Sequence, residues 1–204
     1  ESAAYVTMTK GVLERAFVPV RFFPGNDTFQ ITPAIYQPFD TAVEADWSQA
    51  AFRCAAQTLG STVRIRGMEN GSFQGDRIVV AHAGTLSGAG TATIALSTWP
   101  ALLPPRAVRA ALRRGDTRFV GAARLRLKES DRLSTVCEML TDLGGEAEQG
   151  PDTLTVHGVD QLSGGIVDGA NDHRIVMAAA IAATRCRGPV VIRGGEAVKK
   201  SYPG

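Results

Sequence analysis

The densest group of chemically useful residues is the stretch Lys128–Arg132, which reads Lys-Glu-Ser-Asp-Arg. It precedes an apolar series with the spacing of one helix face, closed by Gly144 and Gly145, so we expect it to open a helix. A helix start offers unpaired N–H groups and a partial positive charge, and the lysine and arginine add two full charges. The stretch is therefore predicted to bind an anion.

Glu129 is the acidic residue between these cations. The neighbouring charges favour its ionised form and should hold its pKa below about 4.3, whereas burial would push the pKa up. A carboxyl group under such opposed influences suits proton transfer. The plain alternative for the whole stretch is a solvated, well-capped helix start without a chemical role.

Two further polar stretches carry cations. Asn171–Arg174 opens the last Ala-rich helix, and Lys199–Pro203 follows the last predicted strand. Judged alone, they are an N-cap with a solvated arginine and a lysine pair in a polar tail. Together, Arg132, Arg174 and Lys200 suit a small polyanion that bears phosphate or carboxylate groups.

The elements that position these residues repeat along the chain. One unit consists of an Ala-rich helix, a glycine stop and a strand, and its copies open at Asp46, Ala101 and Asp172. A second, alternating unit opens near Ser2, Gln74 and Glu129, and its middle copy is abridged, running into a Gly/Ser/Thr-rich stretch at Gly84–Thr93 that we predict to be a loop.

Such alternation predicts an α/β domain built of βαβ-like modules. The residues that open the units should converge on one mouth, and they include Asp46, Gln74, Glu129, Arg132, His173 and Arg174.

Individual elements follow from the same patterns. We predict a helix around Tyr5–Phe17, then strands at Pro19–Phe23 and Thr28–Thr32. Next come a short strand at Val43, a helix at Asp46–Leu59 and a strand through Val63 and Ile65. Arg124–Leu127 alternates like a strand, and Glu146–Ala147 with Thr153–Val156 reads as a strand pair.

Composition limits the functional classes. The 204 residues are 44% hydrophobic and carry 22 basic against 20 acidic residues, so the net charge of +2 does not demand nucleic acid. The three cysteines are far apart and read as reduced core thiols of a cytoplasmic protein, with no metal site expected. The longest apolar run, Met177–Ala183, is too short to span a membrane. The chain opens at Glu1 without a methionine, which suggests a piece of something longer.

Nucleic-acid binding is the competing class. Arg106, Arg109 and Arg113 share one face of a predicted helix. Aromatic residues make up only 6% of the chain and none lies among these arginines. We therefore expect a solvated helix face and no nucleic-acid partner.

Several motifs, in order, resemble one known family. Val-Glu-x-Asp-Trp-Ser, Gln-Gly-Asp, Lys-Glu-Ser-Asp-Arg-Leu, Asn-Asp-His-Arg and Lys-Ser-Tyr-Pro look like the C-terminal half of 5-enolpyruvylshikimate-3-phosphate synthase. The resemblance covers nearly the whole chain. UDP-N-acetylglucosamine enolpyruvyl transferase is a poorer match.

The resemblance implies a fold of repeated βαβαββ modules, with substrates between two similar domains. By resemblance, residues 1–42 would be the C-terminal module of the second domain, and 43–204 would form the first domain from three modules, the middle one abridged. The chain would then comprise one nearly complete domain and part of a second. Its missing partner would be the N-terminal half of the same enzyme.

The resemblance also implies a reaction of the shikimate pathway, which makes aromatic amino acids. The enolpyruvyl group of phosphoenolpyruvate passes to the 5-hydroxyl of shikimate 3-phosphate and phosphate is released, without a cofactor. Position by position, Glu129 matches the proton donor and Lys128 a neighbouring lysine that contacts substrate. Arg132, Arg174 and Lys200 match the phosphoenolpyruvate-binding residues, and Ser2 matches a serine on the shikimate phosphate.

One departure bears on catalysis. The family places its general-base aspartate where this chain has Ala101, and a methyl group cannot accept a proton. The family's C-terminal helix after Lys-Ser-Tyr-Pro also has no counterpart here. Two hypotheses follow: an enolpyruvyl transferase that needs its other half, or a catalytically impaired, anion-binding remnant of that enzyme.

Overall fold

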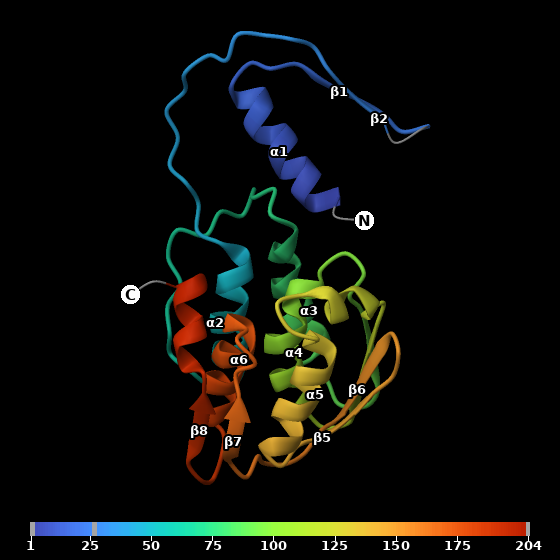
Figure 1. The fold of residues 1–204 in the computed structure, drawn as a ribbon, viewed down its shortest axis with the longest axis vertical. Coiled ribbons are helices and arrows are strands. Elements are labelled where there is room, and N and C mark those ends of the chain that lie inside the picture. Colours follow the sequence, from blue (N-terminus) through green and yellow to red (C-terminus); the bar gives the residue numbers. More distant parts are fainter. Residues whose placement is uncertain (1–2, 26–27, 203–204) are drawn as a thin grey trace.

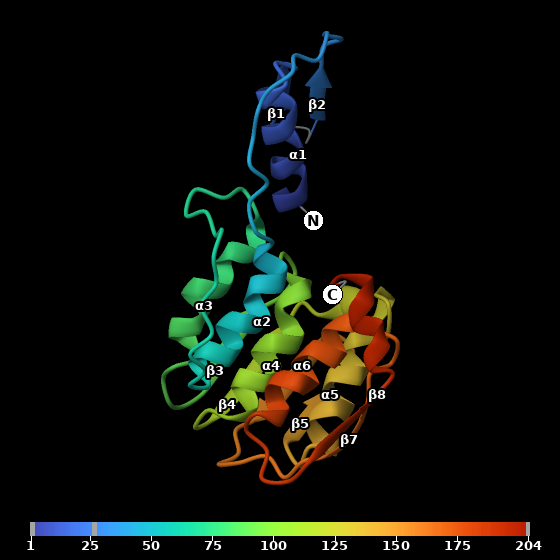
Figure 2. The ribbon, with the colours of Figure 1, turned by 90° about the vertical axis from the view of Figure 1, so that its left-hand side faces the viewer.

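The centre of the main body is a group of helices that pack against one another and are flanked by short sheets (Figures 1 and 2). The structure, a computed structural model, describes residues 3–25 and 28–202. The central helices are α2 (Trp47–Thr58), α4 (Leu103–Ala111), α5 (Arg132–Asp142) and α6 (His173–Ala183). Their facing sides are rich in alanine and leucine, and small side chains let helices approach closely.

One complete βαβαββ module runs through the middle of the chain. Its strands form a four-stranded sheet in the order β3-β4-β6-β5, in which β3 and β4 are parallel and the other neighbours are antiparallel. Helices α4 and α5 connect these strands in sequence. The strands are β3 (Ala92–Ala95), β4 (Asp116–Val120), β5 (Glu146–Gln149) and β6 (Thr153–His157). The predicted α/β module is therefore confirmed, together with the strand pair after α5.

Gly115 makes the turn between α4 and β4 possible. Its φ of +104° lies in the left-handed region, and a Cβ there would come within 2.5 Å of the Gly90 carbonyl oxygen. Only glycine fits such a position without displacing the backbone. The glycine stop that the sequence pattern predicts thus lets the chain return along the sheet.

A second, parallel pair of strands lies beside α6. Strand β7 (Gly165–Asp168) pairs with β8 (Val190–Arg193), and α6 connects them as a crossover helix. The 3-10 helix η4 (Gly195–Lys200) then packs against α6. The predicted final helix and strand are confirmed, whereas β7 was missed because glycines precede and open it.

The N-terminal segment extends away from this body (Figures 1 and 2). Helix α1 (Ala3–Arg15) is followed by the antiparallel hairpin of β1 (Val20–Phe23) and β2 (Thr28–Ile31), as predicted. No described residue of α1 is buried, and every residue of β2 is exposed. Of its described residues, 3–25 and 28–42, only Ala16 and Val18 are buried, so this segment has very little hydrophobic core of its own.

The strand predicted for Arg124–Leu127 is wrong. Residues Ala123–Leu127 form a 3-10 turn, η3, which Asp152 caps by accepting a hydrogen bond from the Ala123 N–H at 2.5 Å. Leu125 is fully buried and Leu127 is 85% exposed, whereas a strand would place both leucines on the same face.

The strands predicted at Val43 and through Val63 and Ile65 are also wrong. These residues have no regular structure, although the Ala45 N–H donates to the Gly67 carbonyl at 2.9 Å. This single hydrogen bond does not continue as a ladder, because neither stretch has a neighbouring strand among the described residues. Alternating apolar residues need such a partner to form a strand.

The loop predicted at Gly84–Thr93 holds only for its middle part. Helix α3 (Val79–Thr85), which follows the 3-10 helix η1 (Gly75–Ile78), includes the first two residues of the stretch, and β3 begins at Ala92. The loop is also tied down, because Arg113 donates to the carbonyl oxygens of Gly88 and Gly90, each at 2.7 Å.

The prediction of a solvated arginine face is wrong for two of the three arginines. Arg106 and Arg113 are only 2% and 5% exposed, and Arg109 is half-buried. Proline and alanine neighbours let α4 pack on every side, so these arginines lie inside the body. They do not form the exposed basic surface that nucleic-acid binding would require.

Candidate active site

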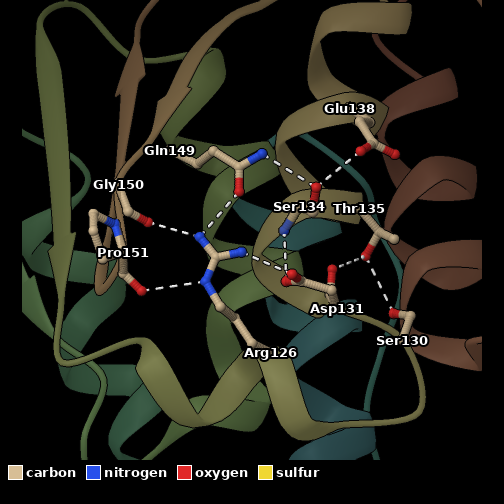
Figure 3. A network of polar contacts seen from close by, with 9 residues as sticks. All are labelled: Arg126, Ser130, Asp131, Ser134, Thr135, Glu138, Gln149, Gly150 and Pro151. Atoms are coloured by element: carbon tan, nitrogen blue, oxygen red, sulfur yellow. Dashed lines mark hydrogen bonds and ion pairs between the residues drawn. The ribbon is translucent and has the colours of Figure 1, made fainter.

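The stretch Lys128–Asp131 reaches α5 as a loop that Arg126 fixes in place. This guanidinium donates to the Asp131 carboxylate and to the Gly150 carbonyl, both at 2.7 Å, and Figure 3 shows it between the β5–β6 turn and the start of α5. Asp131 also caps the helix by accepting from the Ser134 N–H at 3.1 Å. The predicted helix start is confirmed, and its loop is cross-linked to the sheet.

Arg132 is the most buried cation of the site. Its side chain is 2% exposed and forms ion pairs with the Asp172 carboxylate at 2.8 Å and the Glu129 carboxylate at 2.5 Å. Asp172 is fully buried, and it also caps α6 by accepting from the Arg174 N–H at 2.9 Å. One aspartate therefore joins the starts of α5 and α6, which confirms that two of the predicted motifs meet.

A cavity of about 540 Å³ lies at this junction. Four predicted site residues, Lys128, Glu129, Arg132 and Arg174, line it. The remaining lining residues are Tyr5, Thr98, Pro100, Ala101 and Arg124. Several cations and one carboxylate thus face one open space at the starts of α5 and α6.

Arg174 contacts the position where the family's aspartate is replaced. Its Nη1 donates to the Ala101 carbonyl oxygen at 3.5 Å, at the limit of a hydrogen bond. Burial, followed by the nearby charge of Arg132, lowers the pKa of Arg174, whereas Asp76 and Asp46 raise it. The two arginines therefore repel each other across the cavity, and an anion between them relieves that repulsion.

Lys200 and Ser2 are not among the residues that line this cavity. The Lys200 ammonium group is exposed and donates to the Asn171 carbonyl oxygen at 2.7 Å, next to Asp172 in the chain. It therefore lies beside the junction, on the η4 side. Ser2 lies outside the described residues.

The other residues predicted at the mouth lie partly elsewhere. Asp46 and Gln74 line a neighbouring cavity of about 380 Å³, which shares Tyr5 and Thr98 with the first. His173 is 7% exposed and follows Asp172, and burial lowers its pKa. The mouth thus consists of two adjoining spaces, one rich in cations and one rich in acceptors.

Three lining residues were missed by sequence reasoning. Tyr5 comes from α1, far away in the chain, and Thr98 lies three residues before Ala101. Arg124 was assigned to a strand, so its position in a 3-10 turn was not foreseen. Each of the three lies close in sequence to a predicted site position: Arg124 to Lys128, Thr98 to Ala101, and Tyr5 to Ser2.

Glu129 is held in its ionised form. Its side chain is 44% exposed, and although burial raises its pKa, backbone hydrogen bonding and the charge of Arg132 lower it more, so the net shift is downward. This matches the prediction from the neighbouring cations.

This shift predicts an acid-dependent loss of stability. A carboxyl group with a lowered folded-state pKa contributes stability above its unfolded value of about 4.3, and the contribution disappears as the pH falls through the lower folded value. Because the side chain is exposed, we expect less than about 1 kcal/mol. Urea unfolding between pH 3 and pH 7 gives the free energy of unfolding of the chain and of Glu129→Gln. The two free energies should differ near pH 7 and converge in acid. A constant difference over this range would contradict the lowered pKa of Glu129.

The described residues offer no sign of a metal centre or a membrane span. No group of three or more His, Cys, Asp or Glu side chains within residues 3–25 and 28–202 could hold a metal ion. In the same ranges, no helix combines the length and the apolar character needed to cross a bilayer. The cysteines are free thiols: Cys137 is buried, and Cys54 and Cys186 are partly buried.

The fold has close counterparts among solved structures. EPSP synthase from Acinetobacter baumannii superposes with a TM-score of 0.78 over 96% of this chain and 52% of its own, at 22% sequence identity. The enolpyruvyl transferase NikO from Streptomyces tendae gives a TM-score of 0.70 over 97% of this chain and 50% of its own, at 16% identity. The architecture is therefore that of the enolpyruvyl transferases.

Comparison of the sequence with known families identifies one family within this class. Residues 1–204 match the family described as EPSP synthase (3-phosphoshikimate 1-carboxyvinyltransferase), and the chain belongs to that family. It is 35% identical to the 3-phosphoshikimate 1-carboxyvinyltransferase of Clostridium perfringens and 37% identical to that of Clostridium acetobutylicum. Both alignments include the whole chain, which spans about half the length of these relatives, 52% and 50%.

Proposed function

We propose that this chain forms half of an enzyme that transfers the enolpyruvyl group of phosphoenolpyruvate to the 5-hydroxyl of shikimate 3-phosphate. The single observation that carries the proposal is the cavity at the start of α5, where Glu129 lies among Lys128, Arg132 and Arg174. A substrate with phosphate and carboxylate groups needs such a set of cations. Membership of the family supplies the reaction type.

Each residue has a proposed role. Arg132 and Arg174 hold phosphoenolpyruvate, and Lys200 joins them from η4. Lys128 contacts both the reacting centre and shikimate 3-phosphate, and Ser2 binds the phosphate of the latter. Glu129 delivers a proton to the methylene carbon. The ion pair that Glu129 forms with Arg132 at 2.5 Å supports this role, because it fixes the carboxylate at the edge of the cavity.

The proposed reaction passes through a tetrahedral intermediate. The Glu129 proton forms the C–H bond at the methylene carbon while the 5-hydroxyl oxygen bonds to the neighbouring carbon and loses its proton to a base. The tetrahedral intermediate then loses a proton from its new methyl group to Glu129. The bond to the phosphate oxygen breaks, and the enolpyruvyl ether and phosphate are released.

Substrate binding itself prepares Glu129 for this role. In the structure backbone hydrogen bonding and the charge of Arg132 lower its pKa despite partial burial, so the group is ionised at neutral pH. A bound phosphoenolpyruvate brings negative charge beside the carboxylate and occupies Arg132, and both changes raise the pKa of Glu129. Substrate binding is therefore expected to favour the protonated form of the donor.

The proposed enzyme needs a second polypeptide segment. We divide the chain into residues 1–42, which end the second domain, and 43–204, which form the first from three modules with an abridged middle one. The exposed α1 and the exposed β2 support this division, because a covering segment would bury them. The N-terminal half of the enzyme is the proposed partner, and the free thiols fit the proposed cytoplasmic location.

The impaired-remnant alternative has one specific observation in its favour. Ala101 lines the cavity, where its methyl group cannot accept the hydroxyl proton. In that case the chain binds both substrates without turnover.

The direct test is a phosphate-release assay with both substrates. The chain is assayed alone and mixed with the separately expressed N-terminal half of a related 3-phosphoshikimate 1-carboxyvinyltransferase. We expect turnover only in the mixture, and a loss of roughly 10²–10⁴-fold in kcat for Glu129→Gln. Glu138→Gln, on an exposed face of α5, is the matched control. Equal turnover of the two variants would exclude the proposed donor.

A further inference from the structure

Arg126 does not line the anion cavity, but its guanidinium bridges two segments of the chain next to it. The group donates four hydrogen bonds, which Figure 3 shows together. At the β5–β6 turn they reach the carbonyl oxygens of Gly150 at 2.7 Å and Pro151 at 3.2 Å, and the side-chain oxygen of Gln149 at 3.2 Å. The fourth reaches the Asp131 carboxylate at 2.7 Å. One rigid, planar group therefore joins the sheet to the loop before α5.

The ion pair alone does not explain this arrangement. The side chains of Arg126 and Asp131 are 31% and 41% exposed, and exposed ion pairs contribute little to stability. A lysine would supply the same charge, but its single ammonium group cannot reproduce a fixed fork of donors that faces the turn and the loop at once. The geometry of the guanidinium is thus the feature that the bridge requires.

The loop that Arg126 holds carries two carboxylates, and only that of Glu129 lines the cavity. Asp131 is directed elsewhere, because one of its oxygens accepts from Arg126 and the other caps α5 by accepting from the Ser134 N–H. A second carboxylate facing the cavity would cancel part of the positive charge that attracts an anion. The direction of Asp131 therefore matters for the anion site.

We propose that Arg126 is a positioning residue of the anion site, which sets where the loop presents Lys128 and Glu129 and keeps Asp131 outside the cavity. The inference rests on the proposed function, since Glu129 is the proposed proton donor there. Arg126 itself touches no substrate in this account. It acts through the loop that it ties to the β5–β6 turn.

The other end of the loop is held at Ser130, whose hydroxyl donates to the buried Asp172 carboxylate at 3.1 Å. Without the Arg126 bridge this contact remains, but the loop loses its attachment to the β5–β6 turn. The Glu129 carboxylate, which is 44% exposed and lies 2.5 Å from Arg132, is then expected to spend part of its time in solvent. The pairing of Glu129 with Arg132 therefore reports the position of the loop.

The test measures the pKa of the Glu129 carboxyl by NMR in the full chain labelled with 13C-glutamate, and Glu129→Gln identifies the signal. In the unmodified chain partial burial raises this pKa, while backbone hydrogen bonding and the charge of Arg132 lower it more. Arg126→Lys keeps the charge at this position but not the fork. We expect the pKa of Glu129 to rise toward its ordinary value of about 4.3 in Arg126→Lys and in Arg126→Met.

Arg113→Met is the matched control, because Arg113 ties a different loop by donating to the carbonyl oxygens of Gly88 and Gly90, each at 2.7 Å. Its loss should lower the urea concentration at the midpoint of unfolding and leave the pKa of Glu129 unchanged. This control separates a general loss of stability from a displaced loop.

Three results would overturn the positioning role. They are a pKa of Glu129 that stays low in both Arg126 variants, an equal rise in Arg113→Met, and a rise in Arg126→Met alone, which would assign the effect to charge. If Arg126→Met does not fold, Arg126→Lys decides. These measurements use no substrate, so an unchanged pKa would leave the proposed transfer untouched, whereas a lack of turnover in the mixture would leave the pKa result standing.

Discussion

Replacing Arg132 with methionine is expected to lower the free energy of unfolding by about 3–5 kcal/mol. The guanidinium, 2% exposed, is the partner of the fully buried Asp172 carboxylate at 2.8 Å. Without it, Asp172 keeps a buried charge and, among the described residues, has only the Ser130 hydroxyl and one backbone N–H as donors. A methionine of similar length preserves the packing, so the loss reports the unpaired charge.

Urea unfolding monitored by circular dichroism measures this effect. Arg118→Met, an exposed arginine on β4, is the matched control and should change stability by no more than about 0.5 kcal/mol. Adding Asp172→Asn to Arg132→Met should recover part of the loss, because the amide is neutral and still caps α6. If Arg132→Met were as stable as Arg118→Met, the central role of this ion pair would be wrong.

Introducing a carboxylate at Ala101 is expected to raise turnover by roughly 10²–10⁴-fold in the mixture with the N-terminal half. Ala101 lines the cavity that Glu129 and Arg174 also line. Its carbonyl lies 3.5 Å from Arg174 Nη1, so a carboxylate there stays ionised beside a cation and can accept the proton of the hydroxyl.

The phosphate-release rate of Ala101→Asp, compared with that of Ala101→Asn, isolates the proton acceptor. The asparagine has the same size but cannot take up a proton, so it should leave the rate unchanged. A large gain for the aspartate alone would mean that the unmodified chain is an impaired form of the enzyme. A rate equal to that of the unmodified chain would show that the base is supplied elsewhere.

The sequence predicted those parts of the fold in which local pattern and tertiary environment agree. The capped, Ala-rich helices α2 and α6, the turn at Gly115 and the β5–β6 pair follow from spacing and turn residues. The two false strands share one cause. Arg124–Leu127 and Val63–Ile65 alternate like strands, but a strand also needs a neighbour, and pattern alone does not reveal whether one exists.

The charged residues of the site were predictable from the sequence, whereas the uncharged residues that line the cavity were less so. The residues at Lys128–Arg132 and Asn171–Arg174 predicted that two helices begin with cationic side chains. The ion pair between Arg132 and Asp172 joins these two helix starts. Tyr5 and Thr98 were not foreseen, because they reach the cavity only through the path of the chain. Arg106 was predicted to be solvated, because charged residues are normally exposed. It is buried because of how α4 packs, which the sequence pattern does not reveal.

The most direct test of the account is a calorimetric titration of the chain with phosphoenolpyruvate in the presence of shikimate 3-phosphate, repeated with Arg174→Met and with Arg118→Met. We predict saturable binding that weakens by at least roughly tenfold in Arg174→Met and weakens further with added salt, while Arg118→Met binds like the unmodified chain. Equal affinity of Arg174→Met and the unmodified chain would contradict the claim that the cations at the starts of α5 and α6 form one anion site.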